Sequence, residues 1–263
     1  MAAVAAPARR SRGIWRLAVL AVIGIYFAVP FLSALKFALQ TDTGGYSFAA
    51  FAAIPGTQGF ADAFGLSLRL AVVTTIITLV LMVPTAVYVH LRAPALRRIF
   101  DLVTVLPIVI PPVVLIIGVL DVAPALLKAT PYLLALMYVV LAMPFSYRSL
   151  DAGLGAIDVR TLFDAARSLG AGPVESLFRV LLPNLRSAVL AATVLTVALV
   201  LGEYTMASLD SYQTFPVWIV YFEQDNSHIS VAASFMALVV TWVLLLVLSA
   251  FEGVGRRSPA GDA

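Results

Sequence analysis

The sequence contains no cysteine, only two histidines and only two lysines, and each shortage excludes a class of protein. Without cysteine there is no disulfide framework, no thiol nucleophile and no thiolate metal site. The histidines, His90 and His228, are too far apart in sequence to form a local ligand pair, so no metal site is expected. Lys36 and Lys128 both follow leucine, whereas a P-loop needs a Gly-Lys pair after a glycine-rich turn. The chain therefore cannot be its own P-loop ATPase.

Charged residues are scarce as well. They make up 12% of the 263 residues, and hydrophobic residues make up 62%, whereas an ordinary soluble domain is about 25% charged and about 45–50% apolar. The mean hydropathy is +1.01. So few charges cannot cover a soluble globule, and the sequence predicts an integral membrane protein. The net charge is +3, but the charges lie in the gaps between apolar runs, which argues against nucleic acid as a partner.

Six apolar stretches are long enough to cross a bilayer, which requires roughly 20 such residues. They lie near 14–35, 67–90, 101–120, 132–150, 187–206 and 229–251. The first follows a cluster of arginines, but its apolar run is too long for a signal peptide, so it is expected to remain as an uncleaved anchor. The expected fold class is an all-α integral membrane protein with about six transmembrane helices.

The orientation follows from the basic residues, because cytoplasmic loops retain Lys and Arg. With the N-terminus inside, three basic residues fall outside, namely Lys36, Arg69 and Lys128. Fourteen fall inside: Arg9, Arg10, Arg12, Arg16, Arg92, Arg97, Arg98, Arg148, Arg160, Arg167, Arg179, Arg186, Arg256 and Arg257. Both termini are therefore expected in the cytoplasm. The expected organisation is a tail at 1–13, a transmembrane domain at 14–251 with a long cytoplasmic loop at 151–186, and a tail at 252–263.

Prolines interrupt the third apolar stretch. Pro107, Pro111 and Pro112 each remove a backbone donor, so this span is predicted to break or bend. Two interpretations remain open: a static kink, or a flexible helix that faces a substrate path, as broken helices often do in transporters.

The long loop contains two short predicted helices that are hinged at glycines. Thr161 is expected to cap the first helix, with Asp164 three residues later in capping-box spacing. Gly170 and Gly172 permit a positive φ, and Pro173 suits the first turn of the next helix. An apolar stripe at i, i+3, i+4, i+7 then follows, made of Val174, Leu177, Phe178 and Leu181. These features predict a folded loop that docks on another protein, because a passive connection would not need them.

At these residues the chain resembles the permease subunits of binding-protein-dependent ABC importers, whose loop signature is E-A-A-x3-G-x9-I-x-L-P. Asp164–Ala166 reads D-A-A, Gly170 follows after three intervening residues, and Val180, Leu182 and Pro183 follow with the family spacing. Asp replaces Glu and Val replaces Ile, and both changes are conservative. The resemblance extends to the whole chain in length and number of spans. It implies the type I ABC importer permease fold in a bacterial inner membrane.

The resemblance also implies a mechanism and partners. The helix that contains Asp164–Leu169 would be a coupling helix seated in a cytoplasmic ABC ATPase dimer, which binds ATP-Mg and hydrolyses it. This chain would bind no cofactor and catalyse no reaction. A second homologous permease, giving a heterodimer, and an extracytoplasmic substrate-binding protein would complete the importer. The residues implied in ATPase coupling are Phe163, Asp164, Ala165, Ala166, Arg167, Ser168, Leu169, Gly170, Leu182 and Pro183.

The candidate translocation path consists of Thr74, Thr78, Pro111, Pro112, Glu203 and Tyr204. Glu203 lies at the outer end of the fifth span, where it is either a path carboxylate or a solvated charge at a helix end. The chain looks similar to the spermidine/putrescine-type branch, and an acidic path end would suit a cation, so a polyamine or similar small solute is expected. Permeases for ferric iron, thiamine, phosphonate or oxyanions are also similar and remain alternatives.

Three other classes of membrane protein compete with this interpretation. An ion-coupled secondary transporter normally has ionisable residues in mid-span and internal repeats, but the span centres here are almost free of charge. An intramembrane enzyme would need a nucleophile–base pair within the bilayer, and no such pair stands out. A structural scaffold would have no use for the D-A-A…G…L-P loop.

Overall fold

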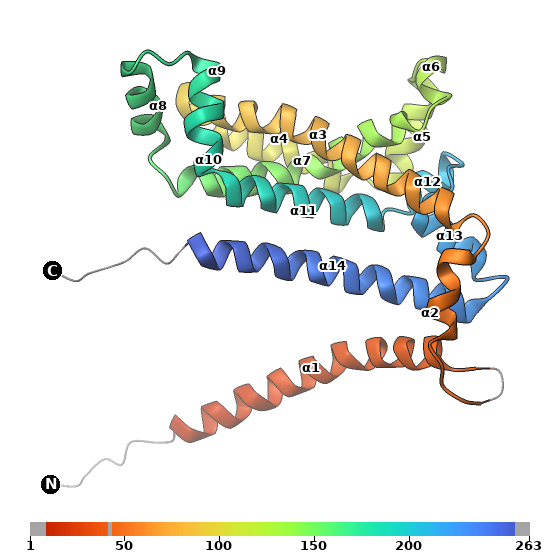
Figure 1. Ribbon diagram of the computed structural model, residues 1–263. Helices are drawn as coiled ribbons and strands as arrows, with labels where there is room; N and C mark the ends of the chain where they lie inside the picture. Colours follow the sequence, from red (N-terminus) through yellow and green to blue (C-terminus); the bar gives the residue numbers. More distant parts are fainter. Residues whose placement is uncertain (1–8, 42–43, 256–263) are drawn as a thin grey trace, which may run out of the picture.

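The computed structural model describes residues 9–41 and 44–255, so the predicted tails lie largely outside the described residues. The regular elements of the described residues are helices (Figure 1). They are α1 Arg9–Leu39, α2 Ala49–Ala53, α3 Phe60–Arg92, α4 Arg97–Val109, α5 Pro112–Val122, α6 Ala125–Lys128, α7 Tyr132–Gly155, α8 Val159–Ser168, α9 Pro173–Ser176, α10 Leu182–Asn184, α11 Arg186–Gly202, α12 Thr205–Leu209, α13 Phe215–Phe222 and α14 Ser227–Gly255.

Four of the described helices, α1, α3, α7 and α14, are long and apolar enough to cross a membrane by themselves. Two further spans are helix pairs that are bent at a short break. Residues Pro94–Val109 and Pro112–Val122 meet at 94°, and residues Pro173–Asn184 and Arg186–Gly202 meet at 80°. Counting each bent pair as one span gives six, and the predicted all-α membrane fold is confirmed.

The third span breaks where the prolines predicted. Ile110 and Pro111 both take extended backbone angles, and Pro112 starts α5, where its missing N–H costs nothing. The fifth span differs from the prediction of 187–206, because α11 ends at Gly202 and Glu203 is extended. Its 17 residues rise about 25 Å at 1.5 Å per residue, which is slightly short of a full crossing.

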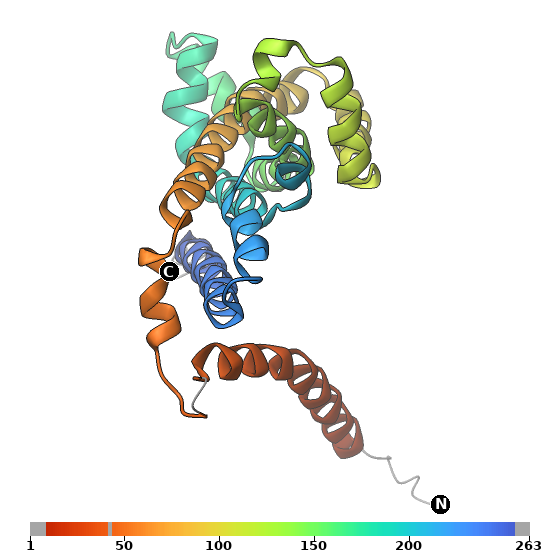
Figure 2. The same ribbon diagram turned by 90° about the vertical axis from the view of Figure 1, so that its right-hand side faces the viewer.

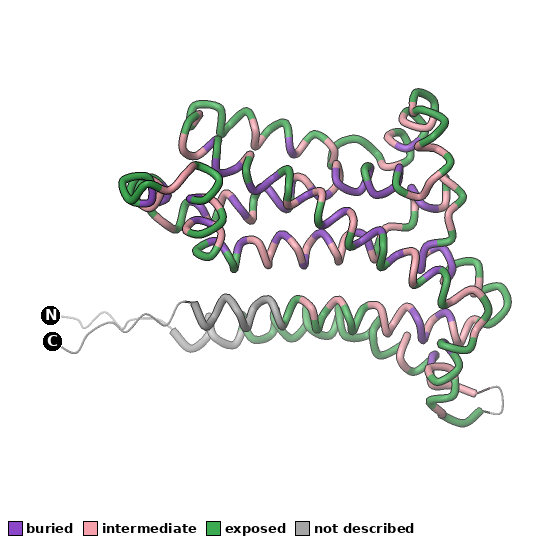
Figure 3. Tube along the Cα trace, turned by 45° about the horizontal axis from the view of Figure 1, so that its top comes forward, coloured by how far each residue is buried: buried purple, intermediate pink, exposed green. Residues whose placement is uncertain are grey.

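Helices α3, α7 and α11 pack against one another and form the core of the subunit (Figures 1 and 3). At one end of this core α5 and α12 join the packing through Ile116 and Met206. At the other end the long loop between α7 and α11 joins it through Val159 and Leu181. The core helices thereby connect the loop to α5 and α12 at the opposite end.

Helix α1 stands apart from this core. It contacts α14 beside Ala38, which is fully buried, and then diverges from α14 toward the N-terminus (Figures 1 and 2). Its membrane-length stretch Trp15–Leu39 is otherwise exposed within the subunit, apart from Ala34, Leu35 and Leu39, which are half-buried. An apolar helix of this kind is stable only when lipid or another helix covers it.

Candidate coupling surface and translocation path

Helix α8 begins at a cap that differs from the prediction. The Asp158 side chain accepts hydrogen bonds from Thr161 N at 3.1 Å and from Thr161 Oγ1 at 2.7 Å. Thr161 is therefore the donor, and the predicted cap at Thr161 is wrong by one turn. The spacing D-x-x-T satisfies the first amides of the helix as well as T-x-x-D would. The hydroxyl and the amide of Thr161 hold the pKa of the Asp158 carboxyl below its usual range.

Helix α8 ends in a Schellman motif, with two backbone hydrogen bonds around Gly170. Ala171 N donates to Ala166 O at 3.1 Å, and Gly170 N donates to Arg167 O at 3.0 Å. Gly170 has φ +90°, a left-handed angle that other residues adopt only with strain. The predicted turn at Gly170 is confirmed. Gly172 has φ −69° and is extended, so only one of the two glycines uses its conformational freedom.

The two faces of α8 differ in exposure. Ala166 is buried against its own loop, Phe163 is half-buried in the cluster at the end of the core, and Leu169 at the tip is 90% exposed. Arg167 Nη1 donates to Ala171 O at 3.0 Å and braces the turn. The remaining predicted coupling residues on the outer face are exposed, namely Asp164, Ala165, Arg167, Ser168 and Gly170. This face is free for a partner.

The second helix of the loop is widened into a π-helical turn over Leu177–Leu181. Leu182 N donates to Leu177 O, five residues back, and Pro183 has no N–H with which to continue an α-helical ladder. Only part of the predicted apolar stripe is packed. Leu181 is fully buried and Leu177 half-buried, whereas Val174 and Phe178 are exposed. Of the predicted anchors, Leu182 is half-buried and Pro183 exposed.

Two predicted path residues lie inside the subunit. Thr74 and Thr78 are fully buried on α3, where the helix packs against α7 and α11. Thr74 Oγ1 donates to Ala135 O of α7 at 3.3 Å, and Thr78 Oγ1 is buried without a hydrogen-bond partner in the described structure. Their role in a path stays a prediction.

Glu203 lies at the break after α11 and accepts three hydrogen bonds. Met206 N donates to Oε1 at 2.8 Å, Ala207 N donates to Oε2 at 3.3 Å, and the hydroxyl of Tyr138 donates to Oε2 at 2.9 Å. Two of these donors are backbone amides in the first turn of α12. The Glu203 carboxylate therefore acts as a cap for the start of this helix. Tyr204 next to it is 37% exposed.

The structure brings the remaining path candidates to the same end of the molecule. Pro111 is exposed and Pro112 half-buried at the start of α5, and α5 packs against α12. Thr74 and Glu203 contact α7 at Ala135 and Tyr138, three residues apart. The start of α5 and the end of α11 are thus brought together through the α5–α12 contact.

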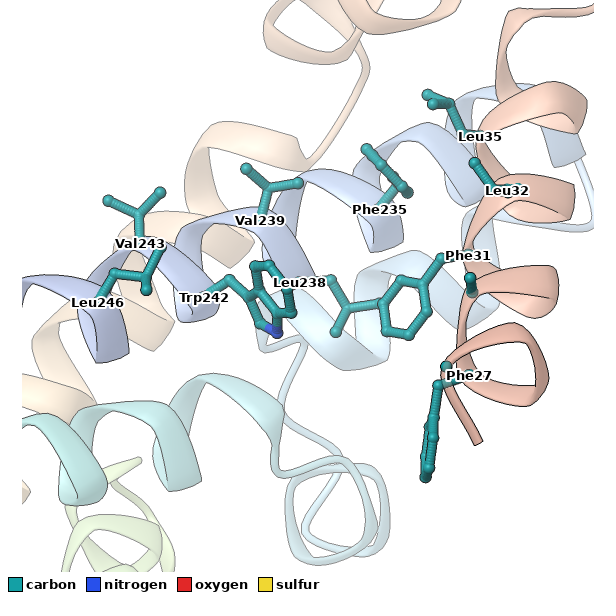
Figure 4. Close-up of a pocket in the computed structure, with 12 residues that line it drawn as sticks. Phe27, Phe31, Leu32, Leu35, Phe235, Leu238, Val239, Trp242, Val243 and Leu246 are labelled. Atoms are coloured by element: carbon teal, nitrogen blue, oxygen red, sulfur yellow. The ribbon is translucent and has the colours of Figure 1, made fainter. Parts of the chain in front are cut away.

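A cavity of about 520 Å³ lies between α1 and α14, where the helices diverge (Figure 4). Phe27, Phe31 and Leu32 line it from α1, and Phe235, Leu238 and Trp242 line it from α14. Its lining carries no charged side chain, and the indole of Trp242 is its one side-chain donor. A polar solute has no means of binding there.

Two residues that sequence reasoning missed complete these sites. Asp158 caps α8, and its position three residues before Thr161 is a signal that could have found it. Tyr138 holds Glu203 from 65 residues away, and its only signal is a polar tip within an apolar span.

Comparisons with known proteins place these features in a family. A family model of binding-protein-dependent transport system inner membrane components matches residues 71–257, which include the whole loop. A probable molybdenum ABC transporter permease protein of Haloferax volcanii is 30% identical, with the match covering 91% of this chain and 95% of that protein. The molybdenum transport system permease protein ModB of Mycobacterium tuberculosis is 28% identical over 92% and 93%. The probable transport system permease protein NifC of Clostridium pasteurianum is 23% identical over 70% and 71%.

A solved structure has the same fold. The crystal structure of a bacterial alginate ABC transporter, in complex with an alginate pentasaccharide-bound periplasmic protein, contains a chain that matches with a TM-score of 0.65. The match covers 95% of this chain and 97% of that one at 14% identity. At this identity the likeness concerns the fold alone.

Proposed function

The chain belongs to the family of binding-protein-dependent transport system inner membrane components, and from this premise we propose how it works within an ABC importer. As the permease subunit, it forms the translocation path together with a second permease. Helix α8 and the Gly170 turn dock on a cytoplasmic ABC ATPase dimer, which supplies ATP hydrolysis. Movement of the docked loop changes the access of the path from one side of the bacterial inner membrane to the other.

The observation that carries this proposal is the build of the loop. Its base is anchored in the core by Val159, Leu181 and Leu185, while its tip exposes Leu169 and the outer face of α8. A capped helix that ends in a Schellman motif is rigid and can transmit a push. An exposed leucine at the tip of a rigid element is the kind of side chain that a partner protein buries.

The topology and the partners follow from the same premise. Both termini lie in the cytoplasm, as the basic residues indicate. The second permease is a homologous chain, giving a heterodimer, and an extracytoplasmic binding protein delivers the substrate. Helix α1 and the α4–α5 pair have exposed apolar surfaces. The second permease and the lipid would cover these surfaces.

The substrate that we propose is a tetrahedral oxyanion of the molybdate class. Support comes from relatives that match more than nine-tenths of this chain and carry molybdenum in their names. Molybdenum in neutral water is the divalent oxyanion molybdate, which places these relatives with the oxyanion alternative.

A polyamine substrate, which the sequence favoured, finds no support among these relatives. The physical basis for expecting a cation was a carboxylate at the end of the path. Both oxygens of the Glu203 carboxylate already accept hydrogen bonds from this chain's own Tyr138, Met206 and Ala207. A carboxylate so engaged has little capacity left to bind an ammonium group.

Site-specific crosslinking tests the coupling proposal, and the absence of cysteine makes every introduced cysteine unique. Leu169→Cys places a reactive group at the loop tip without removing a hydrogen bond, whereas Arg167 braces the turn and is less suitable. Glu223→Cys, exposed after α13, is the matched control. We expect Leu169→Cys in native membranes to crosslink to a P-loop ATPase and Glu223→Cys not to do so. Equal crosslinking at both positions would refute the proposed docking of α8. The absence of any crosslink to an ATPase would refute it as well.

Uptake competition tests the substrate class. Cells that express the complete importer should take up labelled molybdate, and excess unlabelled molybdate should suppress this uptake. Putrescine, ferric citrate and thiamine should leave it unchanged. Suppression by putrescine together with no response to molybdate would return the substrate to the polyamine class.

A further inference from the structure

Arg97 and Asp151 form a bidentate ion pair that the sequence did not indicate. Arg97 Nε donates to Asp151 Oδ1 at 2.7 Å, and Arg97 Nη2 donates to Asp151 Oδ2 at 2.6 Å. Two parallel hydrogen bonds fix the relative orientation of both side chains, because the planar guanidinium matches the planar carboxylate. The Asp151 side chain is 16% exposed and the Arg97 side chain 44%, so solvent screens the carboxylate end of this pair less than it screens a fully exposed pair.

The pair lies where three helix ends meet the coupling loop. Arg97 is the first residue of α4, and Asp151 lies about one turn before the end of α7. His90 Nε2, near the end of α3, is 3.7 Å from Asp151 Oδ1. The loop begins directly after α7, and Arg160 of α8 donates to Leu91 O of α3 at 3.3 Å.

Helix electrostatics do not account for the position of either charge. Arg97 is at the amino end of α4, where the helix dipole disfavours a cation. Asp151 is toward the carboxyl end of α7, where the dipole does not favour an anion. The interaction between the two helices therefore explains why these residues stand where they do.

The same seam continues one turn further along both helices. The Phe100 ring of α4 stacks on the Tyr147 ring of α7, with centroids 6.2 Å apart and planes at 25°. The opposite side of α4 is uncovered, with Leu102 and Leu106 exposed. Helix α4 is thus an arm that is held to the core along α7, and it leads through the Pro111 break into α5.

We propose that the Arg97–Asp151 pair is the joint through which the coupling loop moves the broken third span. A displacement of α8 acts on the end of α7, where the ion pair clamps the start of α4. Helix α4 and, beyond the break, α5 move with the loop. Arg97 and Asp151 are positioning residues, and this inference rests on the proposed coupling function of α8.

Three variants separate charge, geometry and pairing. Asp151→Asn keeps the size of the side chain and removes its charge, and Arg97→Lys keeps the charge and removes the planar fork. The double variant Arg97→Asp with Asp151→Arg restores the pair in reverse and places each charge where its own helix favours it. Glu175→Gln and Arg179→Lys are the matched controls, because that pair at 2.7 Å lies in the loop with side chains 44% and 78% exposed.

The readouts are made on the complete complex purified from native membranes. The first is the stimulation of ATP hydrolysis by the binding protein. The second is the change, on adding ATP and vanadate, in the distance between spin labels at Val109→Cys on α4 and Val240→Cys on α14, both exposed positions. A merely stabilising ion pair would alter the yield of complex and leave both readouts of the surviving complex unchanged.

We expect both single variants to lose about tenfold in stimulation, within the usual range of coupling between sites. They should also lose the nucleotide-driven distance change, and the double variant should regain both. The control variants should keep a stimulation within about twofold of the wild type, because an exposed i,i+4 ion pair contributes little to stability. The proposed role of the ion pair would be refuted if the single variants kept wild-type stimulation and the wild-type distance change. It would also be refuted if the double variant recovered neither quantity relative to the single variants. A wild-type complex that lacks an ATPase would refute the proposed function itself.

Discussion

Tyr138 donates its phenolic hydrogen to Glu203 Oε2 at 2.9 Å, and this bond joins the middle of the core to the end of the fifth span. Tyr138 is fully buried in α7, and the same Glu203 carboxylate caps the first amides of α12. One side chain therefore stabilises the end of α11, the start of α12 and their attachment to the core. Removing it would leave two amides and a buried hydroxyl without their acceptor.

Replacement of Glu203 should destabilise the subunit. We expect Glu203→Ala to cost about 2 kcal/mol, the sum expected of a lost helix cap and a lost hydrogen bond to a charged group. Glu203→Gln should cost less, because its amide oxygen still accepts. Urea or thermal unfolding in detergent measures the difference, with the exposed Glu223→Ala as the control. If the two alanine variants unfold alike, the carboxylate is not a structural cap.

The close approach between α7 and α11 also gives a sharp test. A Cβ at Gly153 would lie 2.4 Å from the Cβ of Ala188, a distance that two carbon atoms cannot share. Gly153→Ala should therefore destabilise the core by about 1–3 kcal/mol. Ala188→Gly in the same chain should recover part of this loss by returning the space. Gly118→Ala on α5, where nothing lies within 4 Å, should be neutral or slightly stabilising.

Much of the architecture was predictable because it depends on local chemistry. The apolar stretches located the spans, the prolines located the break after Val109, and the spacing after Asp164 located the Gly170 turn. Each of these features acts within a few residues of its own position. The family model then agreed with the permease class that the loop motif had indicated.

The features that sequence reasoning missed depend on contacts between distant residues. The fifth span was predicted to run to 206, but α11 ends at Gly202, and the Tyr138 that holds Glu203 just beyond this end is 65 residues away. Arg97 stands in a loop of the sequence and Asp151 at a span end, and nothing within either segment indicates that they pair across 54 residues. The cap of α8 differs from the prediction because D-x-x-T from Asp158 and T-x-x-D from Thr161 are both patterns of a helix start, one turn apart.

The left-handed turn at Gly170 should tolerate no side chain without a loss of coupling. Gly170→Ala forces an L-residue to φ near +90°, which costs about 1–2 kcal/mol and favours other loop conformations. Gly172→Ala is the matched control, because Gly172 is extended and has open space around its Cα. We expect binding-protein-stimulated ATP hydrolysis to fall in the first variant only. Equal rates in both would show that the turn is not needed to present α8.

Asp210, which lies outside the spans, should make the stability of the subunit depend on pH. It lies between α12 and α13, its Oδ2 is buried with no hydrogen-bond partner in the described structure, and this burial raises the pKa of its carboxyl. An acid whose pKa is raised by folding binds its proton more tightly in the folded state, so stability falls as pH rises above the unfolded pKa of about 4. At neutral pH Asp210 should therefore lower the stability of the fold.

Asp210→Asn should accordingly raise the unfolding temperature at pH 7, and the gain should shrink as the pH is lowered toward about 4, where wild-type Asp210 becomes protonated in both states. Thermal unfolding of the wild type and of Asp210→Asn in detergent, between about pH 4 and pH 7, measures this gain in unfolding temperature. Asp225→Asn, at an exposed position between α13 and α14, is the matched control. A gain from Asp210→Asn that is the same at every pH would mean that the amide improves packing or hydrogen bonding and that the buried charge is not the cause.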